Sequence, residues 1–120
     1  MLIVAPGSGN RRVRNEAIRA LQANNASLIY AVRTRDGLIK IGCSTDLVTR
    51  LDHIKGGVEE ILALKPGTFA DELAIHRSLR GHATEGREYY FPTPSVLRAV
   101  NAMRAPLGLD PIVQPRRWAA

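Results

Sequence analysis

The chain is poor in cysteine, aromatic residues and long apolar runs. Its only cysteine among 120 residues, Cys43, excludes an internal disulfide and a zinc site built from several cysteines. We interpret Cys43 as a half-buried small residue at a strand end, because no motif around it supports a nucleophile. The three histidines lack the paired spacing typical of metal sites. Aromatic residues make up 5% of the chain, which argues against a surface on which single-stranded bases stack one after another.

No segment has the length and apolarity of a membrane span. The apolar start of the chain, residues 1–6, is too short for a signal peptide. We therefore expect a soluble, cytoplasmic protein with no membrane partner.

Positive charge is in excess. Seventeen lysines and arginines against eleven acidic residues give a net charge of +6. On a chain of this size the excess favours a polyanionic partner, and we expect nucleic acid: DNA, with RNA also open. Four arginines lie in a helix predicted over residues 10–22, namely Arg11, Arg12, Arg14 and Arg19. Two interpretations stay open, a solvated face of an amphipathic helix and a basic arm that lies on phosphates.

Local patterns predict an α+β fold, a small and mostly antiparallel three-stranded sheet flanked by helices. Asp36-Gly37 is a pair typical of a hairpin turn between two strands, and Thr68 with Asp71 forms a capping box at a helix start. Strands are predicted over 28–32, 38–42 and 58–64, and helices over 10–22, 44–55, 68–80 and 95–103, with a short strand or extended segment at 87–91.

The same patterns divide the chain into three parts. Residues 1–26 form a basic helical arm, residues 27–104 form the main domain, and residues 105–120 form a basic tail that contains proline. The length fits a single domain, since domains commonly have about 100–150 residues.

The helix predicted over 68–80 carries the most informative pair of residues. Glu72 falls within or beside an apolar arc formed by Phe69, His76 and Leu79. A carboxylate in that position is costly unless a cation, a metal ion or several donors face it. His76 lies one turn further on and can converge with Glu72 on one point. The pattern alone leaves open an ordinary contact between the two side chains at a helix edge.

Arg50 and Tyr30 are further candidates. Arg50 lies on the flank of a helix whose other face is apolar, so it is either solvated or directed at phosphate. Tyr30 lies in mid-strand and faces the side opposite Ile29, where packing and catalysis are both open.

Five short elements follow one another in an order that resembles the GIY-YIG nuclease superfamily, specifically its short phage and bacterial branch. They are Leu-Ile-Tyr at 28–30, Lys-Ile-Gly at 40–42, Arg50, the helix segment 70–76 with Glu72, and the segment 86–91. The resemblance covers residues 27–100. Each element is short, and it is their order that makes the pattern specific.

The chain departs from the family pattern in three places. Leu28 replaces the first glycine of the GIY motif, which reshapes the strand end. Lys40 replaces the tyrosine of the YIG motif, so the role of that phenol is absent or taken by an amine. The segment 86–91 resembles the closing Gly-Glu-Trp-Phe of the branch with one residue inserted.

The resemblance implies a metal-dependent endonuclease that hydrolyses phosphodiester bonds in DNA. Glu72 would bind one Mg²⁺ or Mn²⁺ ion, which stabilises the leaving alkoxide. Tyr30 would act as a general base toward water, provided that Lys40 or Arg50 lowers its pKa from about 10. Arg50 would also stabilise the pentavalent phosphate. His76 would orient a water, contact phosphate or hold Glu72.

Glu88 is a second candidate carboxylate, either a further metal ligand or one half of a structural salt bridge with an arginine. The residues expected to bind nucleic acid are Arg11, Arg12, Arg14, Arg19, Lys40 and Arg50.

Two other functions stay open. One is a catalytically silent nucleic-acid-binding module on the same fold, which Leu28 and Lys40 support. The other is a small protein-interaction domain whose charge is incidental. A monomer and a homodimer are both compatible with the sequence.

Overall fold

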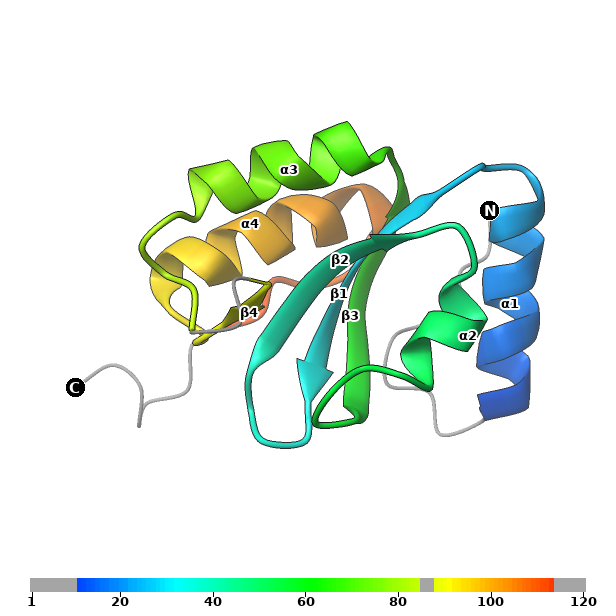
Figure 1. The fold of residues 1–120 in the computed structure, drawn as a ribbon, viewed down its shortest axis with the longest axis horizontal. Helices are drawn as coiled ribbons and strands as arrows, with labels where there is room; N and C mark the ends of the chain where they lie inside the picture. Colours follow the sequence, from blue (N-terminus) through cyan, green and yellow to red (C-terminus); the bar gives the residue numbers. More distant parts are fainter. Residues whose placement is uncertain (1–10, 85–87, 114–120) are drawn as a thin grey trace.

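The computed structural model describes residues 11–84 and 88–113, in which helices and strands are mixed along the chain (Figure 1). The strands are β1 (Leu28–Thr34), β2 (Ile39–Ser44), β3 (Val58–Pro66) and β4 (Tyr89–Tyr90). The helices are α1 (Arg11–Ala23), α2 (Leu47–Leu51), α3 (Phe69–Ser78) and α4 (Pro94–Arg104), followed by the 3-10 helix η1 (Ala105–Leu107). The α+β class expected from the sequence is confirmed.

The strands form one antiparallel sheet in the order β3-β1-β2-β4. The expectation of three strands is wrong, because Tyr89–Tyr90 adds a fourth that pairs with Ile39 and Lys40. Two residues are too few to show the alternation from which a strand is predicted.

The hairpin between β1 and β2 sets the register on which the site depends. It turns at Asp36-Gly37, where Gly37 adopts a φ of 86° that residues with a side chain rarely take. In this register Tyr30 lies directly opposite Gly42.

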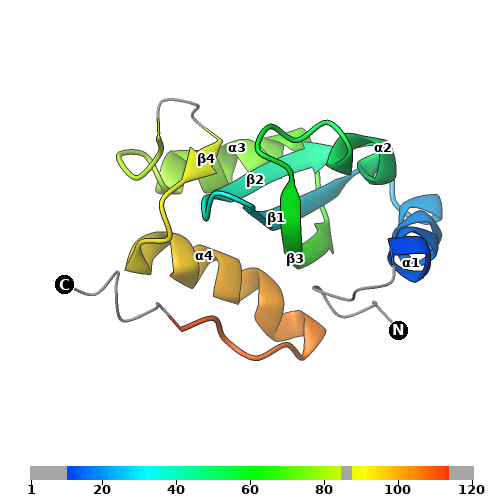
Figure 2. The same cartoon turned by 90° about the horizontal axis from the view of Figure 1, so that it is seen from below.

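Helices cover both faces of the sheet (Figure 2). Ile29 and Ala31 point toward a core that α4 closes, whereas Leu28, Tyr30 and Val32 point toward a second core. Tyr30 therefore faces away from Ile29, as the strand alternation predicts. Residues of α1 and α2 close the second core: Ile18, Leu47, Val48 and Leu51.

Polar caps set the starts of the helices. The capping box predicted for Thr68 and Asp71 is present at α3, where each residue bonds the backbone N–H of the other. The cap of α2 is Asp46, and not Ser44 or Thr45 as expected. The hydroxyl of Ser44 instead accepts the N–H of Asp46 at 3.0 Å and holds the turn before the helix.

The two ends of the described chain pack on the domain. On α1, Ile18 is 2% exposed within the second core. After η1, the backbone N–H of Ile112 donates to the side-chain oxygen of Asn101 on α4 at 2.7 Å. Asn10, residues 86 and 87, and the end of the tail from residue 114 lie outside the described residues. Within residues 11–84 and 88–113, no helix has the length and apolarity needed to cross a membrane.

Candidate active site

The outer side of β2 changes its hydrogen-bond partners along the strand. β4 pairs with the first two residues of β2. Beyond them, the N–H of Ile41 donates to the carbonyl oxygen of Glu88 at 3.2 Å. The carboxylate of Glu72, which α3 carries, lies near the backbone of Cys43, which favours its charged form. The shortness of β4 thus leaves a stretch of β2 along which two glutamates from different parts of the chain are held.

Glu72, His76 and Glu88 come together beside this stretch. Each offers a ligand atom, and these atoms all lie within 4.8 Å of one another. Glu72 and His76 are one turn apart on α3, Glu88 immediately precedes β4, and all three are half-buried. Two carboxylates and an imidazole form a donor set that Mg²⁺ and Mn²⁺ both accept. The sequence singled out all three residues, and the structure brings them together.

Glu72 is held partly out of water. Burial raises the pKa of its carboxyl above the ordinary value, and the negative charge of Glu88 acts in the same direction. His76, Lys40 and the N–H of Cys43 favour the charged form and oppose the rise in pKa. A desolvated carboxylate beside a second one is a position that a cation would stabilise.

His76 is oriented by Tyr90. Its Nδ1 is hydrogen-bonded to the hydroxyl of Tyr90, and the two rings stack with centroids 5.6 Å apart. Its Nε2 is buried and has no hydrogen-bond partner among the described residues. When Nδ1–H donates to the Tyr90 oxygen, Nε2 keeps its lone pair. An outer partner on one ring nitrogen and a free lone pair on the other is the usual arrangement of a metal-binding histidine.

Lys40 lies inside the site, with 7% of the residue exposed. Its Nζ is 3.2 Å from a carboxylate oxygen of Glu88, 5.0 Å from the centroid of the Tyr89 ring and 5.9 Å from that of the Tyr30 ring. The salt bridge considered for Glu88 is therefore present, but its partner is Lys40, not an arginine. Lys40 was also expected to bind nucleic acid, which stays a prediction for a side chain that is almost completely buried.

Tyr30 is almost completely buried, and its ring leans over the strand opposite. A Cβ atom added to Gly42 would collide with the phenol of Tyr30, so only glycine fits at this point of β2. Burial raises the pKa of Tyr30; Arg50 opposes the rise, while Glu88 and Glu72 add to it. The lowered pKa that a general base needs is therefore not found in the metal-free protein.

Arg50 lies in the last turn of α2 and is exposed. α2 packs on the side of the sheet that Tyr30 faces, and the charge of Arg50 favours the ionised form of that phenol, whose pKa burial raises. Among the ion pairs of residues 11–84 and 88–113, none includes Arg50. Its guanidinium is thus available to a phosphate beside Tyr30.

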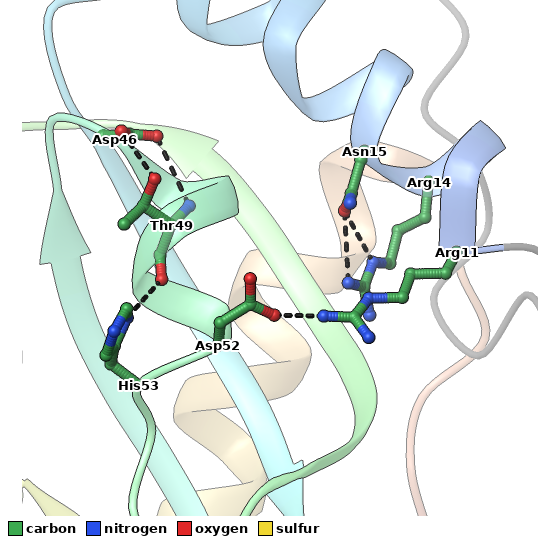
Figure 3. A network of polar contacts seen from close by, with 7 residues as sticks. All are labelled: Arg11, Arg14, Asn15, Asp46, Thr49, Asp52 and His53. Carbon is green, nitrogen blue, oxygen red and sulfur yellow. Dashed lines mark hydrogen bonds and ion pairs between the residues drawn. The ribbon is translucent and has the colours of Figure 1, made fainter.

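The helix that carries Arg11, Arg12, Arg14 and Arg19, α1, lies on the side of α2 away from α3 (Figure 1). Figure 3 shows the guanidinium of Arg11 bonded to the carboxylate of Asp52, at the end of α2. In the same view Arg14 donates to the side-chain oxygen of Asn15, with a nitrogen–oxygen distance of 3.1 Å. The contact of Arg11 with Asp52 ties α1 to α2, whereas that of Arg14 stays within α1.

The remaining arginines of α1 are on the surface. Arg12 pairs with Glu16 one turn away at 3.4 Å, with both side chains largely exposed, and Arg19 is exposed. Exposed pairs contribute only about 0–1 kcal/mol, so the phosphates of a polyanion can replace the acidic partner at little cost. The basic arm is therefore compatible with phosphate contacts away from Glu72, His76 and Glu88.

Two residues of the site were not given a role from the sequence. Tyr90 orients His76, and Gly42 admits the Tyr30 ring. Tyr90 lies in a strand too short to show alternation, and its partner on another element becomes known only in three dimensions.

Comparison with protein-family models, curated proteins and solved structures finds no match to this chain. The resemblance to GIY-YIG nucleases therefore rests on the motifs in the sequence and remains a prediction.

Proposed function

We propose that this chain is a metal-dependent endonuclease of the GIY-YIG type that hydrolyses phosphodiester bonds in DNA. The observation that carries the proposal is the convergence of Glu72, His76 and Glu88 on one point. This group lies within electrostatic reach of the phenol of Tyr30, on which Arg50 also acts. The net charge of +6 favours a polyanionic substrate.

Glu72, His76 and Glu88 would hold one Mg²⁺ or Mn²⁺ ion. The buried Nε2 of His76 without a partner and the two adjacent carboxylates fit such an ion. When bound, the ion supplies positive charge for a phosphate oxygen and for the leaving alkoxide.

The other side chains have separate tasks around the phosphate. Arg50 would bind its oxygens and stabilise the negative charge that grows on them during attack. Lys40 pairs with the carboxylate of Glu88 and would compete with the ion for it. Tyr30 would accept a proton from the attacking water at its phenol oxygen.

The raised pKa of Tyr30 bears directly on that step. Two of its causes are the negative charges of Glu88 and Glu72. A cation bound by these carboxylates would offset both charges, and Arg50 would then favour the phenolate against burial. Proton uptake by Tyr30 would therefore depend on whether Glu72, His76 and Glu88 hold an ion.

The same raised pKa favours a second candidate, a nucleic-acid-binding module without turnover. In that case the phenol stays protonated and the basic surface alone is used. Turnover separates the two functions.

The test is cleavage of supercoiled and branched DNA with Mg²⁺, with Mn²⁺ and with EDTA. We expect cleavage that needs metal and is lost in Glu72→Gln. Glu59→Gln, which removes an exposed carboxylate of β3, is the matched control and should keep it. This control matters because removing any negative charge strengthens binding to DNA.

Two results would contradict the proposal. Cleavage that survives in Glu72→Gln would place the chemistry elsewhere. Binding by both proteins that weakens with salt, without cleavage, would establish the silent module.

A further inference from the structure

A cavity of about 660 Å³ opens beside the proposed site, lined by residues of the β1–β2 turn, the end of the α2–β3 loop and β4. Its volume lies within the range of about 300–1,000 Å³ that is usual for small-molecule sites. The apolar part of its wall consists of Leu38, Tyr89 and Phe91. Its polar groups come from Asp36, Lys55 and Thr84.

Tyr89 joins this cavity to the site. One side of its ring faces Lys40, whose Nζ lies 5.0 Å from the ring centroid and 3.2 Å from a carboxylate oxygen of Glu88. The backbone of Lys55, which also lines the cavity, lies near its phenol and favours the charged form of Tyr89, although burial raises the pKa of that phenol. The ring of Tyr89 therefore lies between the cavity, which it lines, and Lys40, whose ion pair reaches Glu88.

Phe91 is a large apolar side chain that lies exposed at the surface. It lies two residues after Tyr89, while Tyr90 between them is directed into the opposite core and is 1% exposed. Phe91 lines the cavity and is 51% exposed. Two of the few aromatic side chains of the chain therefore gather at one opening beside the site.

We propose that this cavity receives a nucleobase that has left its stack next to the phosphate to be cut. The inference rests on the proposed function for the place of that phosphate. Aromatic and apolar side chains stack on the faces of any base, and this contact tolerates differences in sequence. Asp36 can accept hydrogen bonds from an exocyclic amino group, and the ammonium of Lys55 can bind the adjoining phosphate. The substrate class is thus DNA with an unpaired or easily unpaired base.

The experiment measures binding in EDTA, so that it does not depend on cleavage. Fluorescence anisotropy would compare a duplex that carries one bulged base with the same duplex carrying an abasic nucleotide at that place. We expect the wild-type chain to prefer the bulged base by about tenfold, and Phe91→Ala to lose the preference. Phe91→Trp, which keeps a stacking face, should retain it.

The chain offers a matched control in its other phenylalanine. Phe69 is 56% exposed on α3 and is not part of the cavity wall, so Phe69→Ala should bind both duplexes as the wild type does. Equal affinity of the wild type for the two duplexes would overturn the inference, as would a preference that survives in Phe91→Ala. Metal-dependent cleavage with no base preference would overturn the cavity assignment alone. A base preference without any cleavage would support the cavity and overturn the nuclease.

Discussion

The ammonium nitrogen of Lys40 lies 3.2 Å from a carboxylate oxygen of Glu88, although only 8% of the Lys40 side chain is exposed. A charge in that position needs a partner, since burial removes most of its hydration. Glu88 also belongs to the group with Glu72 and His76. Lys40 and a cation in that group would therefore compete for one carboxylate.

The first prediction follows from this competition. In Lys40→Met the side chain is one atom shorter and loses its charge, which frees Glu88 and makes the group more negative. We expect Mn²⁺ to bind about tenfold more tightly, as measured by calorimetry. The control is Lys65→Met, which removes an exposed lysine of β3 and should leave the affinity as it was. Unchanged or weaker binding in Lys40→Met would show that Glu88 is not a shared ligand.

The second prediction concerns the partner of His76. Tyr90→Phe removes the hydroxyl that holds Nδ1 and leaves the ring in place. Because outer partners of metal-binding histidines set the ring orientation, we expect the affinity for Mn²⁺ to fall by about 10- to 100-fold. Tyr89→Phe removes the neighbouring hydroxyl, which contacts the backbone of Lys55, and should leave the affinity unchanged. Equal affinities of the two variants would contradict a ligand role for His76.

Those elements of the fold that have strong local signals could be predicted from the sequence. The Asp36-Gly37 turn and the alternation around Tyr30 identified the hairpin, and Thr68 with Asp71 identified the start of α3. In each case the residues that decide the structure are neighbours along the chain.

The remainder depends on contacts between distant residues. β4 is too short to carry a pattern and exists because β2 offers it a partner at Ile39 and Lys40. Phe69 was placed on the inner arc of its helix and is instead exposed, because α3 is anchored by its other end, where Leu79 is buried. The ion pair between Lys40 and Glu88 depends on how β2 pairs with β4, which no spacing along the sequence predicts.

The third prediction concerns the close approach of Tyr30 to Gly42. Gly42→Ala places a methyl group where the phenol lies, so the ring must move or the strands must separate. We expect a loss of about 1–3 kcal/mol in the free energy of unfolding, measured by urea denaturation, together with loss of cleavage.

A double-mutant cycle identifies the cause. In a Tyr30→Leu background the Gly42→Ala change should cost at least about 1 kcal/mol less than it does in the wild type, because the clash has been removed. Gly81→Ala is the control, since Gly81 has a φ of 94° and no atom within 4 Å of an added Cβ. Its cost comes from the backbone and should be the same in both backgrounds. Additive costs for Gly42→Ala and Tyr30→Leu would refute the steric explanation.

The last prediction uses Glu72 to separate folding from metal binding. Because burial raises the folded-state pKa of Glu72 above its unfolded value, folding favours the protonated carboxyl. The stability that this provides is fully present below the unfolded pKa and is lost as the pH rises through the folded one. At neutral pH without metal the charged carboxylate is thus a cost, which Glu72→Gln removes.

We therefore expect metal-free Glu72→Gln to melt at a higher temperature than the wild type at neutral pH, and the difference to disappear below about pH 4. With Mn²⁺ the order should reverse at neutral pH, because only the wild type gains stability from a tightly bound ion. Glu59→Gln, at an exposed position, should follow the wild type in both conditions. Two outcomes would contradict this. One is a lower melting temperature for Glu72→Gln than for the wild type without metal, and the other is an equal rise in melting temperature with Mn²⁺ for both proteins. Either would mean that the carboxylate of Glu72 stabilises the fold and does not bind an ion.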